Sequence, residues 1–544
     1  MAGVKMNWFD NLKRKWKNRM TKAIAGTGLA TEFKSVFELS GVPSFQQFYL
    51  YGIFIWKCLW KGFYKPWHVI NAPTIDNPKA TRNVYRMNIS KAICAEMAGL
   101  IWGEECSVNV SMKGHDGKTE DPLDGFVQSV LCANAFHTKM QESIEEGLAL
   151  GGATMKAWAE AKHDENGKEL PETRKVCIGY AMADQFIPVS WDNARVTEGV
   201  FVSRIAKGGY YYTRLEWHRW NGETYVISNE LYRASMDAGK NAEESQDILG
   251  VRYPLSEIYP YLDEVTEIPV EESLFTYWRT PIANNLDDNS PLGMSIYGNA
   301  LETLHALDIC YDSFVREFRL GKKRIIVPAR VVKTVIDPQT MTPVRYFDAT
   351  DETYEALAAD DPQDLKITDN SVELRVEEHI AAINAFLSIL CLQVGFSAGT
   401  FTFDQHTGLK TATEVVSENS KTYKTIKTVQ NQIRPAIEHI VRNIIEVATL
   451  YDMTTEDGQS VANLAAPGYE IKVTFDDGVT QDRQTNINEG VMLVGAGIIS
   501  KKTFLTDPKY GIGMTEEEAD AELARVKEEG RGAVNPLEIF NTAE

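Results

Sequence analysis

The residues that could carry chemistry are scattered along the chain and match no catalytic motif. The nine histidines form no HExxH pair and no close grouping with cysteine that would suit zinc. No Gly-x-Ser-x-Gly nucleophile elbow is present. Because the chain holds 76 acidic residues, neighbouring carboxylates arise by chance, and none is assigned as a general acid or base. We therefore expect no catalytic residue, no metal and no cofactor, and hence no enzyme.

Two segments come close to ligand-binding motifs and fail on spacing. Gly117-Lys118-Thr119 resembles the end of a phosphate-binding loop, but the first glycine of that motif would fall at position 112, which is methionine. Acidic residues gather between positions 348 and 364 without the Asp-x-Asp-x-Asp-Gly pattern of a calcium loop. We interpret the acidic cluster as a solvated face or a surface that docks a partner.

Composition limits the class of protein. A chain of 544 residues is long enough for two to four domains. Its net charge of −20 argues against a protein that coats DNA, though not against one that surrounds DNA without gripping it. The seven cysteines are dispersed and include no CxxC, which predicts reduced thiols in a cytoplasmic product.

The element around which the chain is organised is a predicted long helix at 289–324. Ser290 is a candidate N-cap, and Pro291 would occupy the first helical position. Apolar residues then recur every three or four positions as far as Phe318, while the opposite face carries Asp308, Asp312 and other acidic residues. Gly321 is the predicted end of the helix. Basic side chains follow at the negative end of the helix dipole: Lys322, Lys323 and Arg324.

Two more helices follow in the C-terminal half. The first is predicted at 372–394, after a small mixed module at 325–371. A glycine-rich segment at 395–410 comes next, without the context of a nucleotide-binding loop. A long helix at 411–452 opens with the capping box Thr411-x-x-Glu414. Pro435 lies inside this helix and should kink it.

The N-terminal half begins with a basic amphipathic arm at 1–40. The arm could lie on a membrane surface or bind an acidic partner, but we favour docking on its own protein or on a neighbour. The apolar run 48–60 is too short to span a bilayer, so we interpret it as a buried aromatic cluster. Helices are predicted at 88–102 and 123–150.

Strands are predicted between 155 and 233. The pairs Gly208-Gly209 and Asn221-Gly222 are typical of two-residue hairpin turns, which indicates an antiparallel sheet. From 481 onward the sequence predicts two or three short helices, one of which starts at a second capping box, Thr515-x-x-Glu518.

Three segments of this sequence resemble the portal proteins of tailed bacteriophages, in the branch found in long-tailed phages of Gram-positive hosts. They are 290–293 with 318–327, then 399–404 with 408–415, and finally 96–104. No single segment is a catalytic signature, so the specificity lies in their combination and order. The resemblance covers most of the chain.

The resemblance implies an α+β, mainly helical portal fold. Its parts would be an N-terminal basic arm (1–40), an antiparallel β-rich wing with helices (41–288), a first stem helix (289–324), a small α/β clip (325–371), a second stem helix (372–394), a tunnel loop (395–410), a long kinked helix (411–452) and a helical crown (453–544). Residues expected to face DNA are Lys322, Lys323 and Arg324 at the stem end and Phe401, Phe403, His406 and Lys410 in the tunnel loop.

The family's role would be a ring, typically of twelve subunits, at one vertex of the capsid. Double-stranded DNA would pass through its channel during packaging and ejection. The implied partners are the terminase large subunit, the scaffold, the major capsid protein and head-completion adaptor proteins, with no membrane. The protein would reside in the virion, and in the host cytoplasm during assembly. Two alternatives stay open: a minor head or scaffold-associated protein without a channel, and an enzyme that processes nucleic acid.

Overall fold

The structure is a computed structural model of the whole chain. It describes residues 35–39, 41–43, 45, 47–73, 77–113, 121–164, 169–193, 195–236, 248–321, 324–326, 334–336, 341, 343–345, 368–370, 373–402, 420–475, 483–507 and 511–532. The predicted N-terminal arm, apart from a few residues near its end, and the capping box at 411–414 lie outside this part of the chain.

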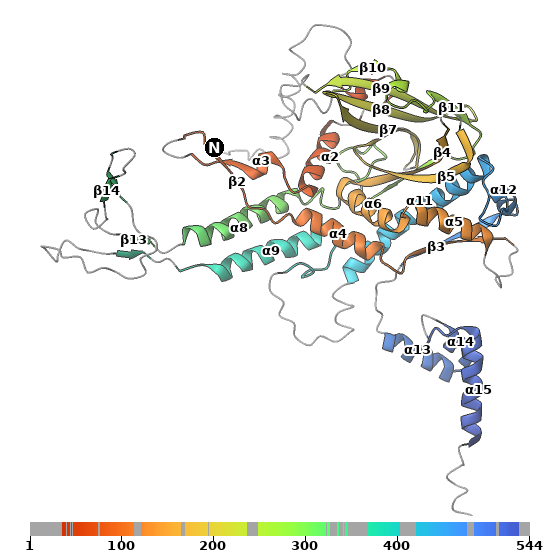
Figure 1. Cartoon of the computed structure of the whole chain (residues 1–544). Helices are drawn as coiled ribbons and strands as arrows, with labels where there is room; N and C mark the ends of the chain where they lie inside the picture. Colours follow the sequence, from red (N-terminus) through yellow and green to blue (C-terminus); the bar gives the residue numbers. More distant parts are fainter. Residues whose placement is uncertain are drawn as a thin grey trace, which may run out of the picture.

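Two antiparallel sheets form the upper part of the body (Figure 1). The larger has the order β10-β9-β8-β7-β6, with β11 also paired to β9; its strands are β6 (Phe186–Asp192), β7 (Arg195–Lys207), β8 (Tyr210–Asn221), β9 (Thr224–Ser235), β10 (Val251–Tyr253) and β11 (Val265–Ile268). The smaller has the order β12-β4-β5, from β4 (Gly152–His163), β5 (Glu169–Met182) and β12 (Phe275–Arg279). The predicted antiparallel strands are confirmed.

Both predicted hairpins are present. Gly208 and Gly209 link β7 to β8 with positive φ angles of 59° and 80°, a conformation that glycine adopts without steric cost. The β8–β9 turn lies one residue later than predicted. Asn221 pairs with Thr224, so the turn residues are Gly222 and Glu223.

Helices pack beneath the sheets: α2 (Gln47–Trp60), α4 (Ile89–Ile101), α5 (Pro122–Ala133) and α6 (Phe136–Leu150). The prediction of one helix over 123–150 is wrong, because the chain breaks at Asn134 and Ala135. Ala135 adopts a φ of +48°. The Asn134 side chain bonds the edge of β5 instead, donating to the Val176 carbonyl at 2.9 Å and accepting from the Ile178 amide at 2.9 Å. The break therefore pins the helices to the smaller sheet.

The first long helix, α8, runs from Leu301 to Leu320, so the predicted start at Pro291 is wrong. The segment before it is buried and irregular. Gly293 bonds to other elements: its carbonyl accepts from the Tyr49 hydroxyl at 2.6 Å, and its amide donates to the Tyr277 hydroxyl at 3.0 Å. A Cβ atom on Gly293 would lie 2.1 Å from the Gly151 carbonyl oxygen, which explains the glycine. The apolar spacing there reflects burial on several sides.

The predicted end of α8 is confirmed, since the Gly321 amide donates to the Glu317 carbonyl at 2.7 Å. The second predicted helix is α9 (Val376–Val394), which starts four residues later than predicted and ends at Gly395 with φ +89°. Between them lie two-stranded sheets formed by β13 (Arg324–Ile326) with β16 (Thr368–Asn370) and by β14 (Thr334–Ile336) with β15 (Pro343–Arg345).

The arrangement of these elements is an elongated hairpin. Helices α8 and α9 lie side by side and extend from the body, with β13 and β14 at their far end (Figure 1). The shorter elements β1 (Val69–Asn71), β2 (Thr81–Asn83) and α3 (Lys65–His68) lie along α8.

Helix α11 (Ser420–Leu450) returns through the body and packs mainly against two strands of the smaller sheet, β4 and β12. After it come α12 (Val461–Ala465) and β17 (Tyr469–Thr474), which pairs with β3 (Ser107–Met112). The last helices are α13 (Arg483–Gly495), α14 (Lys501–Thr506) and α15 (Glu516–Gly532). The capping box before α15 is confirmed. The Thr515 amide donates to Glu518 at 3.1 Å, and the Glu518 amide donates to Thr515 Oγ1 at 3.3 Å.

The core is continuous from the N-terminal helices to α11. The predicted aromatic cluster at 48–60 is confirmed as α2. This helix buries Tyr49 and Trp56 completely and leaves Phe54 48% exposed. All seven cysteines are free thiols, as predicted.

Candidate functional site

The α8–α9 hairpin is held together by specific contacts near its far end. The Arg375 guanidinium makes two hydrogen bonds to the Glu317 carboxylate, at 3.0 and 3.1 Å. These bonds lower the pKa of Glu317. The His379 ring packs on Phe314, with 5.7 Å between ring centroids. Because these pairs join residues from the C-terminal part of α8 to the first turn of α9, they fix the register of the hairpin.

The acidic face of α8 is covered by the N-terminal segment. Asp312 accepts two hydrogen bonds from Arg82, at 2.8 and 2.6 Å, and a third from the Tyr85 amide at 3.1 Å. Asp308 accepts from the Met87 amide at 3.1 Å. The Arg82 hydrogen bond is the main cause that lowers the pKa of Asp312. These two carboxylates attach 82–87 along the hairpin.

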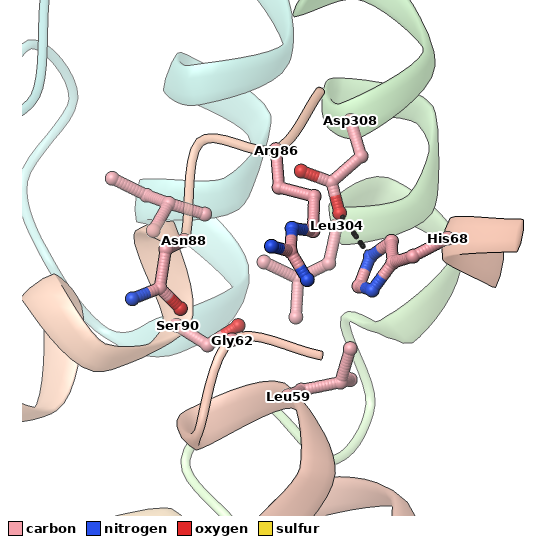
Figure 2. A pocket seen from close by; sticks show the side chains of 9 residues that line it. Leu59, Gly62, His68, Arg86, Asn88, Ser90, Leu304 and Asp308 are labelled. Atoms are coloured by element: carbon pink, nitrogen blue, oxygen red, sulfur yellow. Dashed lines mark hydrogen bonds and ion pairs between the residues drawn. The ribbon is translucent and has the colours of Figure 1, made fainter. Parts of the chain in front are cut away.

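A small pocket adjoins this attachment (Figure 2). The His68 Nδ1 accepts a hydrogen bond from the Tyr64 amide at 2.8 Å, so Nε2 carries the proton and donates to Asp308 at 3.0 Å. The Arg86 guanidinium stacks over the Phe63 ring, with 5.0 Å from Cζ to the centroid. Because His68 and Asp308 already satisfy each other, we assign this pocket a structural role.

The start of the predicted tunnel loop is tied to α11. Ser397 and Thr422 bond reciprocally: the Ser397 amide donates to Thr422 Oγ1 at 2.8 Å, and the Thr422 amide donates to Ser397 Oγ at 3.3 Å. The Thr425 hydroxyl donates to the Gly395 carbonyl at 2.7 Å. The chain therefore leaves α9 and enters α11 at neighbouring points, with 403–419 between them.

Of the four residues predicted to line this loop, the structure describes Phe401. Its ring is half-buried and packs at an angle of 73° on the buried Phe396 ring, with 5.2 Å between centroids. Phe403, His406 and Lys410 lie outside the described residues.

The basic residues predicted at the stem end fall at the boundary between α8 and the clip strands. Lys322 and Lys323 lie outside the described residues. Arg324 begins β13 and pairs in register with Asn370 of β16. Arg324 is therefore located where the clip strands begin, and whether the three residues face a channel stays a prediction.

Pro435 lies on the exposed side of α11, which stays helical on both sides of it. Buried side chains about one and two turns further along this helix anchor the wing. His439 Nε2 and the Asn443 side-chain amide lie 2.9 and 3.1 Å from the Ser273 carbonyl oxygen. Sequence reasoning missed these anchors. It placed Asp308 and Asp312 on the acidic face of the helix but did not predict that they hold the 82–87 segment, although two acidic residues four apart beside an apolar stripe were a usable signal.

Within the part of the chain that the structure describes, no group of three or more His, Cys, Asp or Glu side chains could hold a metal ion. One described helix, α9, has the length and apolar composition of a membrane span, and 22% of the 18-residue window with this composition is buried in the fold.

A mainly helical protein with an antiparallel wing, and with two long helices that carry small strands between them, has the architecture of a phage portal protein. The sequence model described as "Phage portal protein, SPP1 Gp6-like" matches residues 57–535. The chain therefore belongs to this family, whose members are structural proteins of the virion.

Other comparisons add less. No curated protein sequence matches. Among solved structures, a chain from the virion of a native gene transfer agent particle covers 77% of this chain and 88% of its own length. Its sequence identity is 10% and its TM-score is 0.33.

Proposed function

We propose that copies of this chain close into a ring at one vertex of the capsid and form a channel for DNA. The family supports this role, and the observation that carries it is the α8–α9 hairpin. It extends from the body with the clip strands at its end and is fastened by Asp308 and Asp312. A ring of such hairpins, typically twelve in this family, would enclose an axial stem.

The parts of the chain then take the roles that the family suggests. The clip at 325–371 would dock the terminase large subunit during packaging and head-completion adaptor proteins afterwards. Scaffold and major capsid protein would contact the outer surface, and the crown would face the head interior. A net charge of −20 suits passage of DNA better than a tight grip on it. The protein would assemble in the host cytoplasm and end in the virion, without catalysing a reaction.

The test of the ring is electron microscopy of the purified protein, with and without scaffold, together with the particle mass. We expect rings with a central hole and a mass near twelve times 61.1 kDa. Closed particles without a hole would favour a minor head protein. A chain that stays monomeric with scaffold present and turns over nucleotides would favour the enzyme.

A second test concerns the predicted channel residues. Reversing the charge of Lys322, Lys323 and Arg324 together should leave ring assembly intact and reduce the packaged DNA at least tenfold, because DNA would meet repulsion at the stem end. Packaged DNA is measured as nuclease-resistant genome per head. The control is Lys207→Glu, an exposed residue beside the β7–β8 turn. Unchanged packaging in the triple variant would remove these residues from the channel.

A further inference from the structure

Helix α9 carries an apolar stripe on the side that faces away from α8. The stripe consists of Ala381, Ala385, Ile389 and Leu392, all exposed, with Ile389 46% and Leu392 55% accessible. The spacing of three or four residues places them on one face of the helix. The chain holds no Asp, Glu, Lys or Arg between Glu378 and Asp404. A continuous uncharged stripe of this kind marks an interaction surface.

The other side of α9 is already occupied. Ile383, Leu387 and Leu390 are buried, and His379, on the same face, contacts Phe314 of α8. The exposed stripe is therefore additional to the packing that holds the hairpin, and within the described residues it is left open.

We propose that the α9 stripe binds the exposed flank of α8 on the next copy of the chain. The inference rests on the proposed ring and names the surfaces that close it. Two different surfaces that fit each other give a heterologous contact, which is the type that generates rings. The exposed flank of α8 consists of Glu302, Ile309, Ser313 and Arg316.

The pairing of α8 with α9 shows that the α9 stripe and the exposed flank of α8 lie at the same level along the hairpin axis. Both helices rise about 1.5 Å per residue in opposite directions from the Phe314–His379 contact. Ile309, five residues before Phe314, therefore lies at the level of Asn384, next to Ala385. In a ring of equivalent hairpins, the Ile309 side chain, 52% exposed, meets the shallow surface at Ala381 and Ala385 of the neighbour.

Charge supports the same pairing. By the same count, Arg316 lies at the level of Glu377, beside Glu378. Glu377, Glu378 and Arg316 are all exposed. Arg316 of one copy then faces an acidic pair on the next, at the clip end of the interface. Charge complementarity at one end and a large side chain against small ones at the other favour one arrangement and one partner.

A second copy fits this stripe better than a lipid bilayer does. A membrane-spanning α9 would draw its hairpin partner α8 into the bilayer as well. At these levels α8 carries Asp308, Asp312 and Glu317, all of which are ionisable and bonded to the N-terminal segment or to Arg375. Ionised groups are costly in hydrocarbon. Vesicle binding is accordingly an outcome that counts against the proposal.

The first experiment is a charge exchange in the full chain. Arg316→Glu and Glu378→Arg should each reduce the ring fraction at least fivefold at low salt, and the double variant should restore it. The ring fraction is measured by mass photometry, with scaffold present where assembly requires it. The control is Lys139→Glu, an exposed residue of α6, which should leave assembly unchanged. The pairing would be overturned if neither single variant reduced the ring fraction. It would also be overturned if the double variant formed no more rings than the more impaired single variant.

The second experiment tests contact directly and does not depend on the charge variants. A chain with Ile309→Cys and Ala385→Cys should form covalent dimers and longer ladders on oxidation, while each single variant should not exceed the wild-type background. Within one chain the stripe points away from α8, so a bond between the two positions must join two copies. The ladder should disappear when Leu392→Asp is added.

These outcomes separate the inference from the function on which it rests. If wild-type rings form while neither the charge exchange nor the cysteine pair behaves as stated, the interface is wrong and the ring stands. If the wild-type chain forms no ring even with scaffold, the proposed function is wrong, and the proposed interface is wrong as well. Flotation of the wild-type chain with phosphatidylcholine–phosphatidylglycerol vesicles, abolished by Leu392→Asp, would assign the stripe to membrane instead.

Discussion

At the scale of single residues, the side chain on which the hairpin depends most is Asp312. Its carboxylate is 9% exposed and accepts both hydrogen bonds of Arg82, which is itself 26% exposed. Asp312→Ala should lower the free energy of unfolding by about 2 kcal/mol, because a charge-assisted bidentate pair and a backbone bond are lost. Urea unfolding measures this change. Glu302→Ala, at an exposed position of the same helix, should change it by less than about 0.5 kcal/mol.

A buried charge cluster links the two sheets of the wing. Glu216 accepts from Lys156 at 2.5 Å and from Arg214 at 2.6 Å, and it contacts His218 at 3.0 Å. His218 in turn lies 2.8 Å from the Tyr225 hydroxyl. Burial raises the pKa of Glu216, but Lys156, His218 and Arg214 together outweigh it and hold the pKa well below its usual range.

This cluster makes stability depend on pH in a defined direction. Because the pKa of Glu216 is lower in the folded state, its contribution is complete above the unfolded value of about 4.3 and is lost as the pH falls below it. Glu216→Gln should cost about 3 kcal/mol at pH 7, since the largely buried Lys156 and Arg214 lose the carboxylate that they bond. It should also flatten the fall in stability between about pH 5 and pH 3.

Chemical unfolding across this pH range provides the measurement. Glu223→Gln, in the exposed β8–β9 turn, serves as the control and should follow the wild type. A Glu216→Gln variant that loses stability as steeply as the wild type below pH 5 would show that other carboxylates dominate acid unfolding. This cluster could not be predicted from sequence, because Lys156 and Glu216 are 60 positions apart and meet only through sheet packing.

At the scale of elements, the sequence pattern predicted those features that interactions between nearby residues determine. Helix α9, the end of α8 at Gly321 and both hairpin turns follow from spacing and from glycine. The start of α8 and the break at Asn134 did not, because distant groups settle them. Tyr49 and Tyr277 bind the backbone at Gly293, and β5 captures the Asn134 side chain. Apolar residues at helical spacing predict that a segment is buried. They predict a helix only where the backbone does not bond to groups of other elements instead.

Pro435 gives a prediction that belongs to helix α11. A proline in a helix interior removes the bond to the carbonyl four residues earlier, here that of Asn431. Pro435→Ala should slow amide hydrogen exchange in the adjoining turn and stabilise the chain by up to about 3 kcal/mol. If Pro435 kinks the helix, as the sequence predicts, and this bend shapes the subunit for its ring, the same variant should assemble fewer rings. Gln432→Ala, at an exposed position one turn earlier, should do neither.

At the scale of the whole molecule, the described residues form one large hydrophobic core, and the C-terminal helices α13, α14 and α15 contribute no side chain to it. The core joins α2, α4, α6, the sheets, the base of the α8–α9 hairpin and α11. The sequence predicted the order of these parts through a resemblance spread over the chain. It could not predict which surfaces of one copy meet the next, because a periodic stripe looks the same whether its own chain or a neighbour covers it.

The C-terminal helices show this dependence most directly. Of the side chains that the structure describes in α13, α14 and α15, the apolar one that is fully buried is Ala519. Met492 of α13 is 73% exposed, and Ile498, between α13 and α14, is 69% exposed. Among the described side chains of these helices, so little apolar packing does little to offset the loss of chain entropy. We expect these helices to exchange their amide hydrogens within seconds in unassembled chains and to become protected in the ring, while α11 stays protected in both. Hydrogen exchange with mass spectrometry makes the comparison in the full chain. Equal protection of α13–α15 before and after assembly would show that this unit folds on its own and that its exposed Met492 and Ile498 await a different partner.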